Sequence, residues 1–367
     1  MAKYHPVTGK LIVEIPQSYT EITTPVTPVT AAAVAIEEAP APEVIPEVRV
    51  EVTEVVEIPV IKEVVKETVQ ELMPGVVKTQ EDKWTNIQVD STVFTVFQAC
   101  PQKYDYAFNQ HLIPVDGLSN SINRGTYVHA GLLEYWKAII AGENYEVASR
   151  AGVKTAKGML DKNVKINAEY KLETLQTFLT FLNHLQGMNW IPLEVEKHFR
   201  IKAYEDESIR LRIYLTGRID LIIKTPQLSK LPIDFKTESE RWFYSQMSNQ
   251  FKIYALACGT NLVGVQRVGF QEKVKIDDKF KLEMLPFDED ILEEFRTVTL
   301  PYWVKQMIIA HEENFYPMNG SSCVHGHFKC QYSDAYNGGI CNVSRNVRQQ
   351  KLERYFKKGE EWDPANI

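Results

Sequence analysis

Hydrophobic and polar positions divide this chain into two unequal parts. Apolar residues recur at helical or strand spacing from about residue 84 onwards, whereas residues 1–80 show no sustained period. Helical spacing predicts helices over about 91–108, 125–143, 145–188, 242–258 and 288–313, the first interrupted at Cys100-Pro101. Apolar, β-branched runs bounded by turn residues predict strands over 194–203, 209–224, 230–237 and 263–274. This order predicts an α/β fold with a mixed central β-sheet flanked by helices.

Residues 1–80 have the composition of a disordered tail. They hold nine of the eighteen prolines, and no aromatic residue occurs between residues 20 and 83. Such a segment buries too little apolar surface to offset the entropy of ordering. Within it, residues 60–73 place apolar side chains at helical spacing, which indicates either a transient linker helix or a helix that docks on a partner. We therefore expect a disordered acidic tail at 1–80, a folded domain at 81–345 and a C-terminal tail at 346–367.

The net charge of −7 lies almost entirely in the first of these regions. Residues 1–80 carry 6 basic and 12 acidic residues, and the remainder carries 35 and 36. A nearly neutral body can bind nucleic acid through a local basic groove, so the charge does not exclude a DNA-binding protein. The sequence contains no apolar run of membrane-spanning length and no secretory leader, and five cysteines do not suit a secreted disulfide framework. We expect a cytoplasmic protein.

Two neighbouring predicted strands carry acidic residues that would meet in space. The polar stretch 225–229 between them suits a hairpin loop. If the loop centres on Gln227, Asp220 and Asp234 face each other, and Lys236 projects on the same side as Asp234. Aspartate is depleted in strands, so the alternative of ordinary edge charges explains this pattern poorly. Two carboxylates and an ammonium can hold a hard divalent cation and stabilise charge on a phosphate.

The order of motifs along the chain resembles the PD-(D/E)XK nuclease superfamily, and within it the RecB-like exonucleases. Gly125 and His129 resemble the upstream Gly-xxx-His motif, and Asp220 resembles the first metal-binding aspartate. Asp234-Phe235-Lys236 resembles the (D/E)XK element, and Gln250 with Tyr254 the downstream Gln-xxx-Tyr motif. The resemblance covers roughly residues 85–345. It implies a restriction-endonuclease-like core and metal-dependent hydrolysis of phosphodiesters.

The resemblance also implies a role for each matched residue. Mg²⁺ or Mn²⁺ would be bound by Asp220, Asp234, His129 and the carbonyl group of Phe235, and the imidazole would favour Mn²⁺ somewhat. Lys236 would orient the attacking water or stabilise the pentavalent phosphate. Gln250 and Tyr254 share one helix face and would contact DNA or support the metal centre; the alternative is a helix surface with a half-buried tyrosine. Glu196 on the preceding strand is a weaker candidate for the same site.

Four of the five cysteines form a second candidate site. Cys100 precedes the predicted nuclease body, and Cys323, Cys330 and Cys341 follow it. This arrangement resembles the iron–sulfur RecB-like nucleases, which implies that the four thiolates hold a [4Fe-4S] cluster. Zinc on the same cysteines, with His325 or His327 replacing one sulfur, is one alternative, and unliganded thiols are the other. The fifth, Cys258, is expected to be a buried helix residue.

These patterns predict a metal-dependent DNA nuclease, a RecB-like exonuclease that acts on single-stranded DNA ends in recombination, repair or phage DNA processing. The sequence contains no Gly-xxxx-Gly-Lys-Ser/Thr P-loop, so we expect it to act alone or beside a separate helicase or recombination protein. Two alternatives remain open. One is a catalytically silent nucleic-acid-binding or scaffold protein that keeps the nuclease fold, and the other is a nuclease that acts on RNA.

Overall fold

The computed structural model describes residues 84–115, 120–164, 166–238, 245–271, 274–325, 328–333, 339–341 and 343–359, with residues 3–4 and 11–12. The chain divides into two compact units, Met1–Pro59 and Val60–Ile367. In the first unit only β1 (Lys3–Tyr4) and β2 (Leu11–Ile12) are described, and they pair antiparallel. The rest of the predicted tail, including the helix predicted at 60–73, lies outside the described residues.

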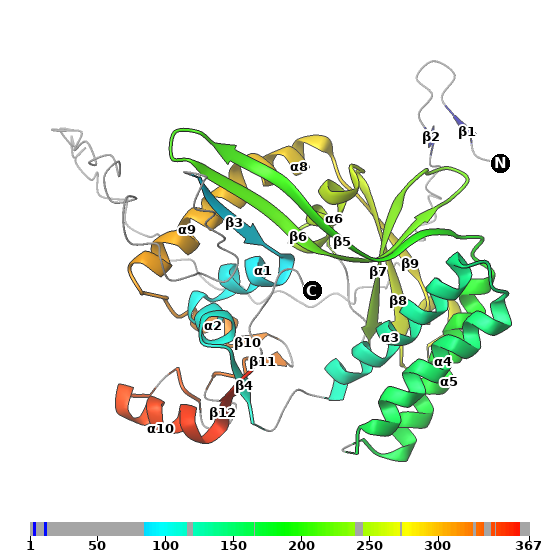
Figure 1. Cartoon of the computed structure of the whole chain (residues 1–367), viewed down its shortest axis with the longest axis horizontal. Helices are drawn as coiled ribbons and strands as arrows, with labels where there is room; N and C mark the ends of the chain where they lie inside the picture. The colour runs from blue at the N-terminus through cyan, green and yellow to red at the C-terminus, as the bar shows by residue number, and fades with distance from the viewer. Residues whose placement is uncertain are drawn as a thin grey trace, which may run out of the picture. The chain divides into compact units, whose positions relative to one another are not determined.

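A six-stranded mixed sheet forms the centre of the second unit (Figure 1). The strand order is β3-β6-β7-β8-β9, and β5 pairs with β6 beside this path. The strands are β3 (Thr85–Val89), β5 (Ile191–Asp206), β6 (Leu211–Lys224), β7 (Leu231–Glu238), β8 (Leu262–Gly269) and β9 (Leu282–Pro286). The β3–β6 and β7–β8 pairs are parallel and the other pairs are antiparallel. The predicted mixed α/β architecture is confirmed, although β3 and β9 were not predicted.

Two hydrophobic cores cover different parts of this sheet. The first core joins β3 and the central part of β6 to α1 (Ser91–Ala99), α6 (Asn249–Cys258), α8 (Glu289–Glu294), the π-helical turn η3 (Phe295–Thr299) and α9 (Leu300–Glu312). The second core joins the end of β6, β7 and β8 to α3 (Asn120–Ile140), α4 (Tyr145–Lys162) and α5 (Ala168–Gln186). The short helix α7 (Ile276–Lys279) precedes β9.

The helix predicted over 145–188 is wrong in one respect, because the chain forms two helices there. Asn163 ends α4 in an extended conformation. Asn167 then begins α5, and its side chain accepts a hydrogen bond from the Tyr170 backbone N–H at 2.8 Å. Asparagine caps satisfy the free backbone groups at helix ends, so the apolar spacing continues across a break that the caps create.

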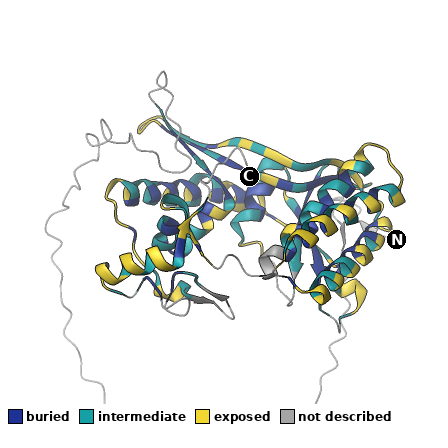
Figure 2. Ribbon diagram, turned by 60° about the horizontal axis from the view of Figure 1, so that its bottom comes forward, coloured by how far each residue is buried: buried dark blue, intermediate teal, exposed yellow. Residues whose placement is uncertain are grey.

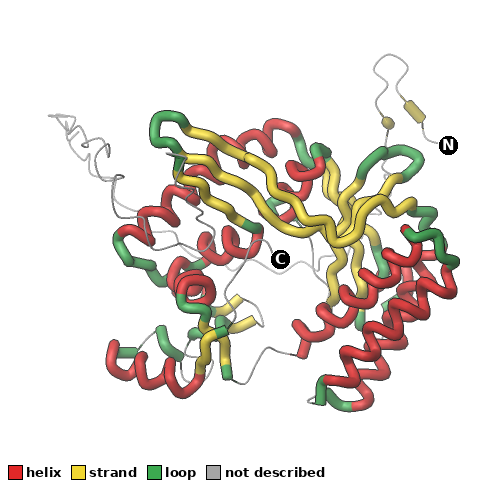
Figure 3. The backbone as a smooth tube through the Cα atoms, viewed as in Figure 1, coloured by secondary structure: helices red, strands yellow, loops and turns green. Residues whose placement is uncertain are grey.

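The β6–β7 hairpin has the register that the sequence predicted. Leu221 pairs with Ile233 and Ile223 with Leu231, and the same register continued by one residue sets Asp220 opposite Asp234. The pairing extends over only three residues, because β6 then continues beside β3 and β5 whereas β7 continues beside β8. Figure 3 shows the two groups of strands diverging from this point. We call it the fork, and both aspartates lie at its opening.

Segments from near the start and near the end of the described part of the second unit pack together in a third core. The strand β4 (Leu112–Pro114) pairs antiparallel with β12 (Phe356–Lys358). The core consists of Tyr106, Tyr332, Ile340 and Phe356, with Cys330 and Cys341 packed against it. The remaining elements here are α2 (Pro101–Tyr104), η2 (Asp105–Asn109), η4 (Gly320–Ser322), β10 (Val324–His325), β11 (Phe328–Lys329) and α10 (Arg345–Tyr355). The predicted C-terminal tail therefore includes α10 and β12.

In the described part of the chain, no helix combines the length and the apolar composition that crossing a bilayer requires.

Candidate active site

A cavity of about 240 Å³ lies at the fork of the sheet. Five different elements contribute to it: β6 and β7 from the sheet, the helices α3 and α6, and the start of α1. Its lining includes six residues that the sequence singled out, namely His129, Asp220, Asp234, Lys236, Gln250 and Tyr254. The lining runs from Asp90 to Tyr254, so residues up to 164 positions apart in the chain meet in one small cavity.

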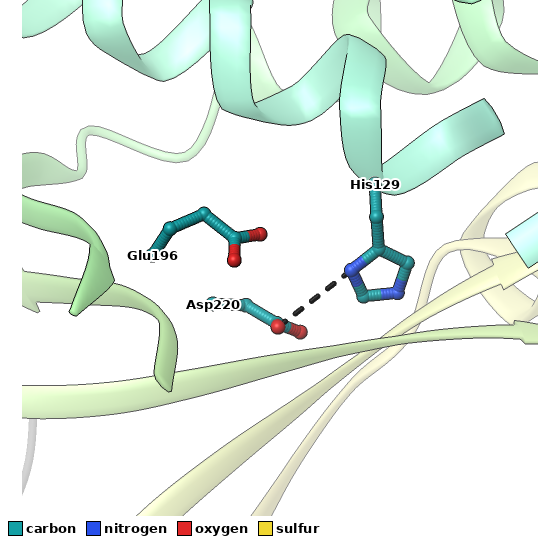
Figure 4. Close-up of side chains that lie close together, drawn as sticks. All are labelled: His129, Glu196 and Asp220. Carbon is teal, nitrogen blue, oxygen red and sulfur yellow. Dashed lines mark ion pairs between the residues drawn. The ribbon is translucent and has the colours of Figure 1, made fainter. Parts of the chain in front are cut away.

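One side of the site is a cluster of possible metal ligands from α3, β5 and β6 (Figure 4). One ligand atom from each of His129, Glu196 and Asp220 lies within 4.8 Å of the other two. The Nδ1 atom of His129 is 3.6 Å from Oδ1 of Asp220. The second Asp220 oxygen, Oδ2, accepts a hydrogen bond of 2.8 Å from the Phe235 backbone N–H, which ties the two arms of the fork together.

Glu196 reaches this cluster from an unusual backbone conformation. Its φ of 49° is left-handed although it lies inside strand β5, and such a conformation costs about 1–3 kcal/mol for a residue with a side chain. Its neighbours Val195 and Lys197 pair with Leu221 and Ile219, so Glu196 lies beside Asp220. An ion pair joins its carboxylate to Arg218. Strain of this kind is concentrated at functional sites, and here it brings a third carboxylate to the fork.

The other side of the site is a hydrogen-bonded network around Asp234. The Lys236 ammonium lies 2.9 Å from Oδ2 of Asp234 and donates to the Gln250 side-chain oxygen at 3.0 Å. The Gln250 amide nitrogen donates to Oδ1 of Asp234 at 2.9 Å and to the Tyr254 hydroxyl at 3.0 Å. The Tyr254 hydroxyl donates in turn to the Arg218 carbonyl at 2.8 Å. Gln250 thus fixes the aspartate and the lysine relative to each other.

Burial and neighbouring charges set the protonation of these groups. Burial raises the pKa of Asp220, and the nearby Asp234 carboxylate raises it further, although His129 acts in the opposite direction. Burial also raises the pKa of Glu196, with a contribution from Asp220. Burial lowers the pKa of Lys236, but the carboxylates of Asp234 and Asp220 outweigh it and the net shift is upwards. Lys236 therefore carries a positive charge beside crowded carboxylates.

The donor set at the fork fits a hard divalent cation. Oδ2 of Asp234 faces the Lys236 ammonium and Oε2 of Glu196 faces Arg218, whereas among the described residues no lysine or arginine pairs with Asp220. A divalent cation beside Asp220 would offset that buried carboxylate charge. Oxygen ligands suit Mg²⁺ and Mn²⁺, and the His129 nitrogen is compatible with Mn²⁺. The Phe235 ring packs in the second core, and its carbonyl group is the ligand expected from the sequence.

The four cysteines of the second candidate site line a separate cavity of about 250 Å³. Cys100 is buried, and its sulfur accepts a hydrogen bond from the Asn319 backbone N–H at 3.4 Å. Burial raises the pKa of Cys341 to about 12, and the other three thiols contribute. Among the described residues, no three of these sulfurs approach one another as closely as the 4.8 Å that groups the ligands at the fork. The convergence of four thiols on one cavity is the arrangement that a shared thiolate-bound metal centre requires.

The remaining candidates for the cysteine site contribute little. His327 lies outside the described residues, and His325 is described only through its backbone in β10. Cys258 is half-buried in α6, where burial raises the pKa of its thiol, and it does not line the cysteine cavity.

Comparison with known proteins gives one match that covers most of the folded unit. A family model described as PD-(D/E)XK nuclease superfamily matches residues 91–335. That range includes the six predicted residues of the fork cavity and, of the four cysteines, all except Cys341. No curated protein matches the chain. A solved structure described as "Crystal structure of SSO0001" is similar with a TM-score of 0.29 and 11% identity, over 64% of this chain and 78% of that one.

Proposed function

The chain belongs to the PD-(D/E)XK nuclease superfamily, and from this membership we propose that it is a metal-dependent DNA nuclease of the RecB-like type, an exonuclease that acts on DNA ends. The superfamily implies nuclease activity in general. The DNA substrate and the exonucleolytic mode are supported by the Gly125–His129 and Gln250–Tyr254 motifs, which resemble those of the RecB-like group.

One observation carries the proposal: Asp220, Asp234 and Lys236 converge on one cavity with their charges intact. A protein that had lost catalysis would gain stability by replacing these groups, because buried charges are costly even when they are paired. Their retention beside the left-handed Glu196 favours an active enzyme over a silent scaffold.

The residues divide the work of phosphodiester hydrolysis between them. Asp220, Asp234 and His129 would hold Mg²⁺ or Mn²⁺, with the Phe235 carbonyl as a further ligand. When bound, the ion supplies an activated water and neutralises charge on the phosphate. Lys236, which gives two of its three N–H groups to Asp234 and Gln250, would direct the third at the attacking or the non-bridging oxygen. Gln250 binds both Lys236 and Asp234, so the ammonium is held between two partners rather than by Asp234 alone. The Tyr254 hydroxyl accepts a hydrogen bond from Gln250 and holds it in this position.

The activity is tested with purified protein, Mn²⁺ or Mg²⁺, and end-labelled single-stranded DNA, duplex DNA and single-stranded RNA. We expect release of short products from DNA ends, and loss of activity in the Asp234→Asn variant, which keeps the shape of the side chain. Cleavage of RNA alone would assign the enzyme to RNA instead. Cleavage of closed circular single-stranded DNA, which has no ends, would show that the enzyme is an endonuclease and not an exonuclease. If no substrate is cleaved, the remaining alternative is the catalytically silent scaffold protein.

We further propose that Cys100, Cys323, Cys330 and Cys341 hold a [4Fe-4S] cluster. The cavity shared by the four thiols supports a thiolate-bound centre, and the order of these cysteines along the chain, which resembles that of the iron–sulfur RecB-like nucleases, favours the cluster over zinc. Such a cluster would join two chain segments more than 220 residues apart, so its role would be structural.

The cluster proposal has its own test. Protein purified without oxygen should be brown, with the broad visible absorption of iron–thiolate centres. Cys341→Ala should bleach it and lower its melting temperature, whereas Cys258→Ala should keep the colour, because Cys258 lies outside the cavity. One zinc and no iron per chain would establish the zinc alternative, and protein without metal would establish free thiols.

A further inference from the structure

A row of basic side chains runs along one face of the two longest strands, starting beside the active site. Side chains alternate between the faces of a strand. On β6, Ile213, Leu215 and Ile219 point into the first core, so the even-numbered residues from 212 to 218 point the other way. On β5, Phe199 and Ile201 pack against the same core, and their even-numbered neighbours are exposed. Figure 2 shows exposed and half-buried residues along this ribbon.

The exposed face carries mostly cationic groups, and we call it the basic track. The register places His198 opposite Arg218 and Lys202 opposite Tyr214. The same face ends at Glu196 and Asp220, the metal-ligand candidates. The basic track consists of His198, Arg200 and Lys202 on β5 and of Arg212, Tyr214 and Arg218 on β6.

Two of the three arginines of the basic track, Arg200 and Arg212, stack on aromatic rings. The Arg200 guanidinium lies 3.6 Å from the centre of the Tyr214 ring, and that of Arg212 lies 4.1 Å from the Trp84 ring. A stacked guanidinium keeps its N–H donors at its edge, where they match the oxygens of a phosphate. Since the guanidinium groups cover these ring faces, the rings orient cations rather than stack on bases.

The charges of the basic track are only partly neutralised within the chain. Glu205 pairs with both Lys202 and Arg212, and no acidic side chain in the described part of the chain pairs with Arg200. Arg200 therefore adds a permanent positive charge that no acidic side chain of the described residues neutralises, in a protein of net charge −7. Nearer the fork, Arg218 is compensated by Glu196. The Arg200 charge, with Lys202 beside it on the same face, suits a polyanion.

We propose that the basic track binds the phosphate backbone of the nucleic-acid strand that enters the active site, a proposal that rests on the proposed nuclease function. From Asp220 to Arg212 the track extends over eight residues, or about 26 Å at ~3.3 Å per residue. At ~3.4 Å per nucleotide of a helical strand, this length corresponds to roughly eight nucleotides. Because the contacts are to phosphates, binding is independent of base sequence and weakens steeply with salt.

The test measures binding without cleavage. Fluorescence anisotropy of a labelled oligothymidylate longer than the track is recorded in EDTA over a series of salt concentrations. The Arg200→Gln/Lys202→Gln variant should bind about tenfold more weakly at low salt, and the slope of log K against log salt should fall by about 1.4, since each phosphate contact on a single strand contributes ~0.7. Arg200→Gln alone should lower the slope by about 0.7.

Lys197→Gln is the matched control, because Lys197 lies on the same strand but on the opposite face. Its side chain is 46% exposed and that of Lys202 is 51% exposed. This variant should leave both the affinity and the slope unchanged. If Lys197→Gln loses as much affinity as the double variant, the loss is a general effect of protein charge, and the proposal of a phosphate-binding basic track is overturned.

The outcomes separate this proposal from the proposed function. If wild-type protein cleaves DNA but the double variant binds with the wild-type slope, the basic track is wrong and the nuclease assignment stands. If the slope falls as expected but no substrate is cleaved, the nuclease assignment fails and the track stands as a nucleic-acid interface. The same titration is repeated with duplex DNA of equal length. The form of DNA for which the double variant loses more affinity is the form that the basic track binds.

Discussion

Asp220 is the position where we expect activity and stability to respond in opposite directions to one substitution. Its carboxylate lies near those of Asp234 and Glu196, and the permanent cations that pair with these two are Lys236 and Arg218. Three negative charges therefore face two positive ones in the absence of metal. Asp220→Asn removes one negative charge, and the amide oxygen of the new side chain can still accept a hydrogen bond from the Phe235 backbone N–H.

The size of the effect follows from the burial of Asp220. Burial, and then Asp234, raise its pKa above that of the unfolded chain, in spite of His129. The contribution of Asp220 to the stability of the metal-free protein is therefore fully present below its unfolded pKa of ~3.9 and is lost as the pH rises through its native pKa. Relief of this penalty at neutral pH should be worth about 1–2 kcal/mol. At roughly 2 °C per kcal/mol for a domain of this size, the melting temperature should rise by about 2–4 °C.

Calorimetry in EDTA and in Mn²⁺ provides the assay, beside nuclease activity. The wild type should gain about 2.7 kcal/mol when Mn²⁺ is at roughly 100 times its Kd, whereas Asp220→Asn should gain little and lose cleavage. Asp161→Asn is the matched control, because Asp161 is exposed on α4 and paired with Lys157, which lowers its pKa through a hydrogen bond. The control should keep the full Mn²⁺ response and the activity.

Two results would refute this reasoning. A lower melting temperature of Asp220→Asn in EDTA would show that the charge of Asp220 is stabilised by its neighbours even without metal. A wild-type response of the variant to Mn²⁺ would remove Asp220 from the metal site.

Three further predictions concern the network and the helix packing. Lys236→Met should lower the single-turnover rate by about 10²–10³-fold, as loss of a transition-state contact does, and a loss below roughly tenfold would contradict its role. Tyr254→Phe removes the hydroxyl that links Gln250 to the Arg218 carbonyl. We expect a smaller fall in the single-turnover rate than for Lys236→Met, and a loss of about 1–3 kcal/mol in the free energy of unfolding. Unchanged stability would show that this hydroxyl does not hold Gln250 in place. On α4, Gly152→Ala should destabilise the protein by about 1–3 kcal/mol, because the added Cβ would lie 2.8 Å from the Gly131 carbonyl oxygen. Gly158→Ala, which adds a Cβ into open space on the same helix, should stabilise the protein by about 0.5–1 kcal/mol. The reverse order of stabilities in urea unfolding would contradict the close contact between the helices.

The hairpin and its site were predictable because local rules decide them. Apolar alternation and one polar break set the register of β6 and β7, and the observed pairing of Leu221 with Ile233 is the predicted one. The helical spacing of Gln250 and Tyr254 likewise fixes their shared face. Their hydrogen bonds to Asp234 and Lys236 depend on how α6 packs on the sheet, which no local pattern contains.

Other features were beyond local reasoning. Glu196 was predicted only as a weaker candidate, because its position depends on a left-handed residue inside a strand, which sequence propensity disfavours and only tertiary packing maintains. Strand alternation opposite Asp220 was the available signal for it. The strands β3 and β9 have five residues each, too few for a clear period. The convergence of the four cysteines on one cavity agrees with the predicted arrangement, and what they bind stays a prediction.

The pairing of β4 with β12 sets an order of events during synthesis on the ribosome. All the residues of the fork cavity precede residue 255, so that site can be completed while the chain is still growing. The cysteine cavity cannot, because 241 positions separate Cys100 from Cys341. At ~5–20 residues per second, Cys100 waits roughly 12–48 s for its last partner. During that interval its thiol and the Tyr106 side chain lack their C-terminal partners. The yield of folded protein in the cell should therefore depend on the speed of translation and on protection of nascent thiols.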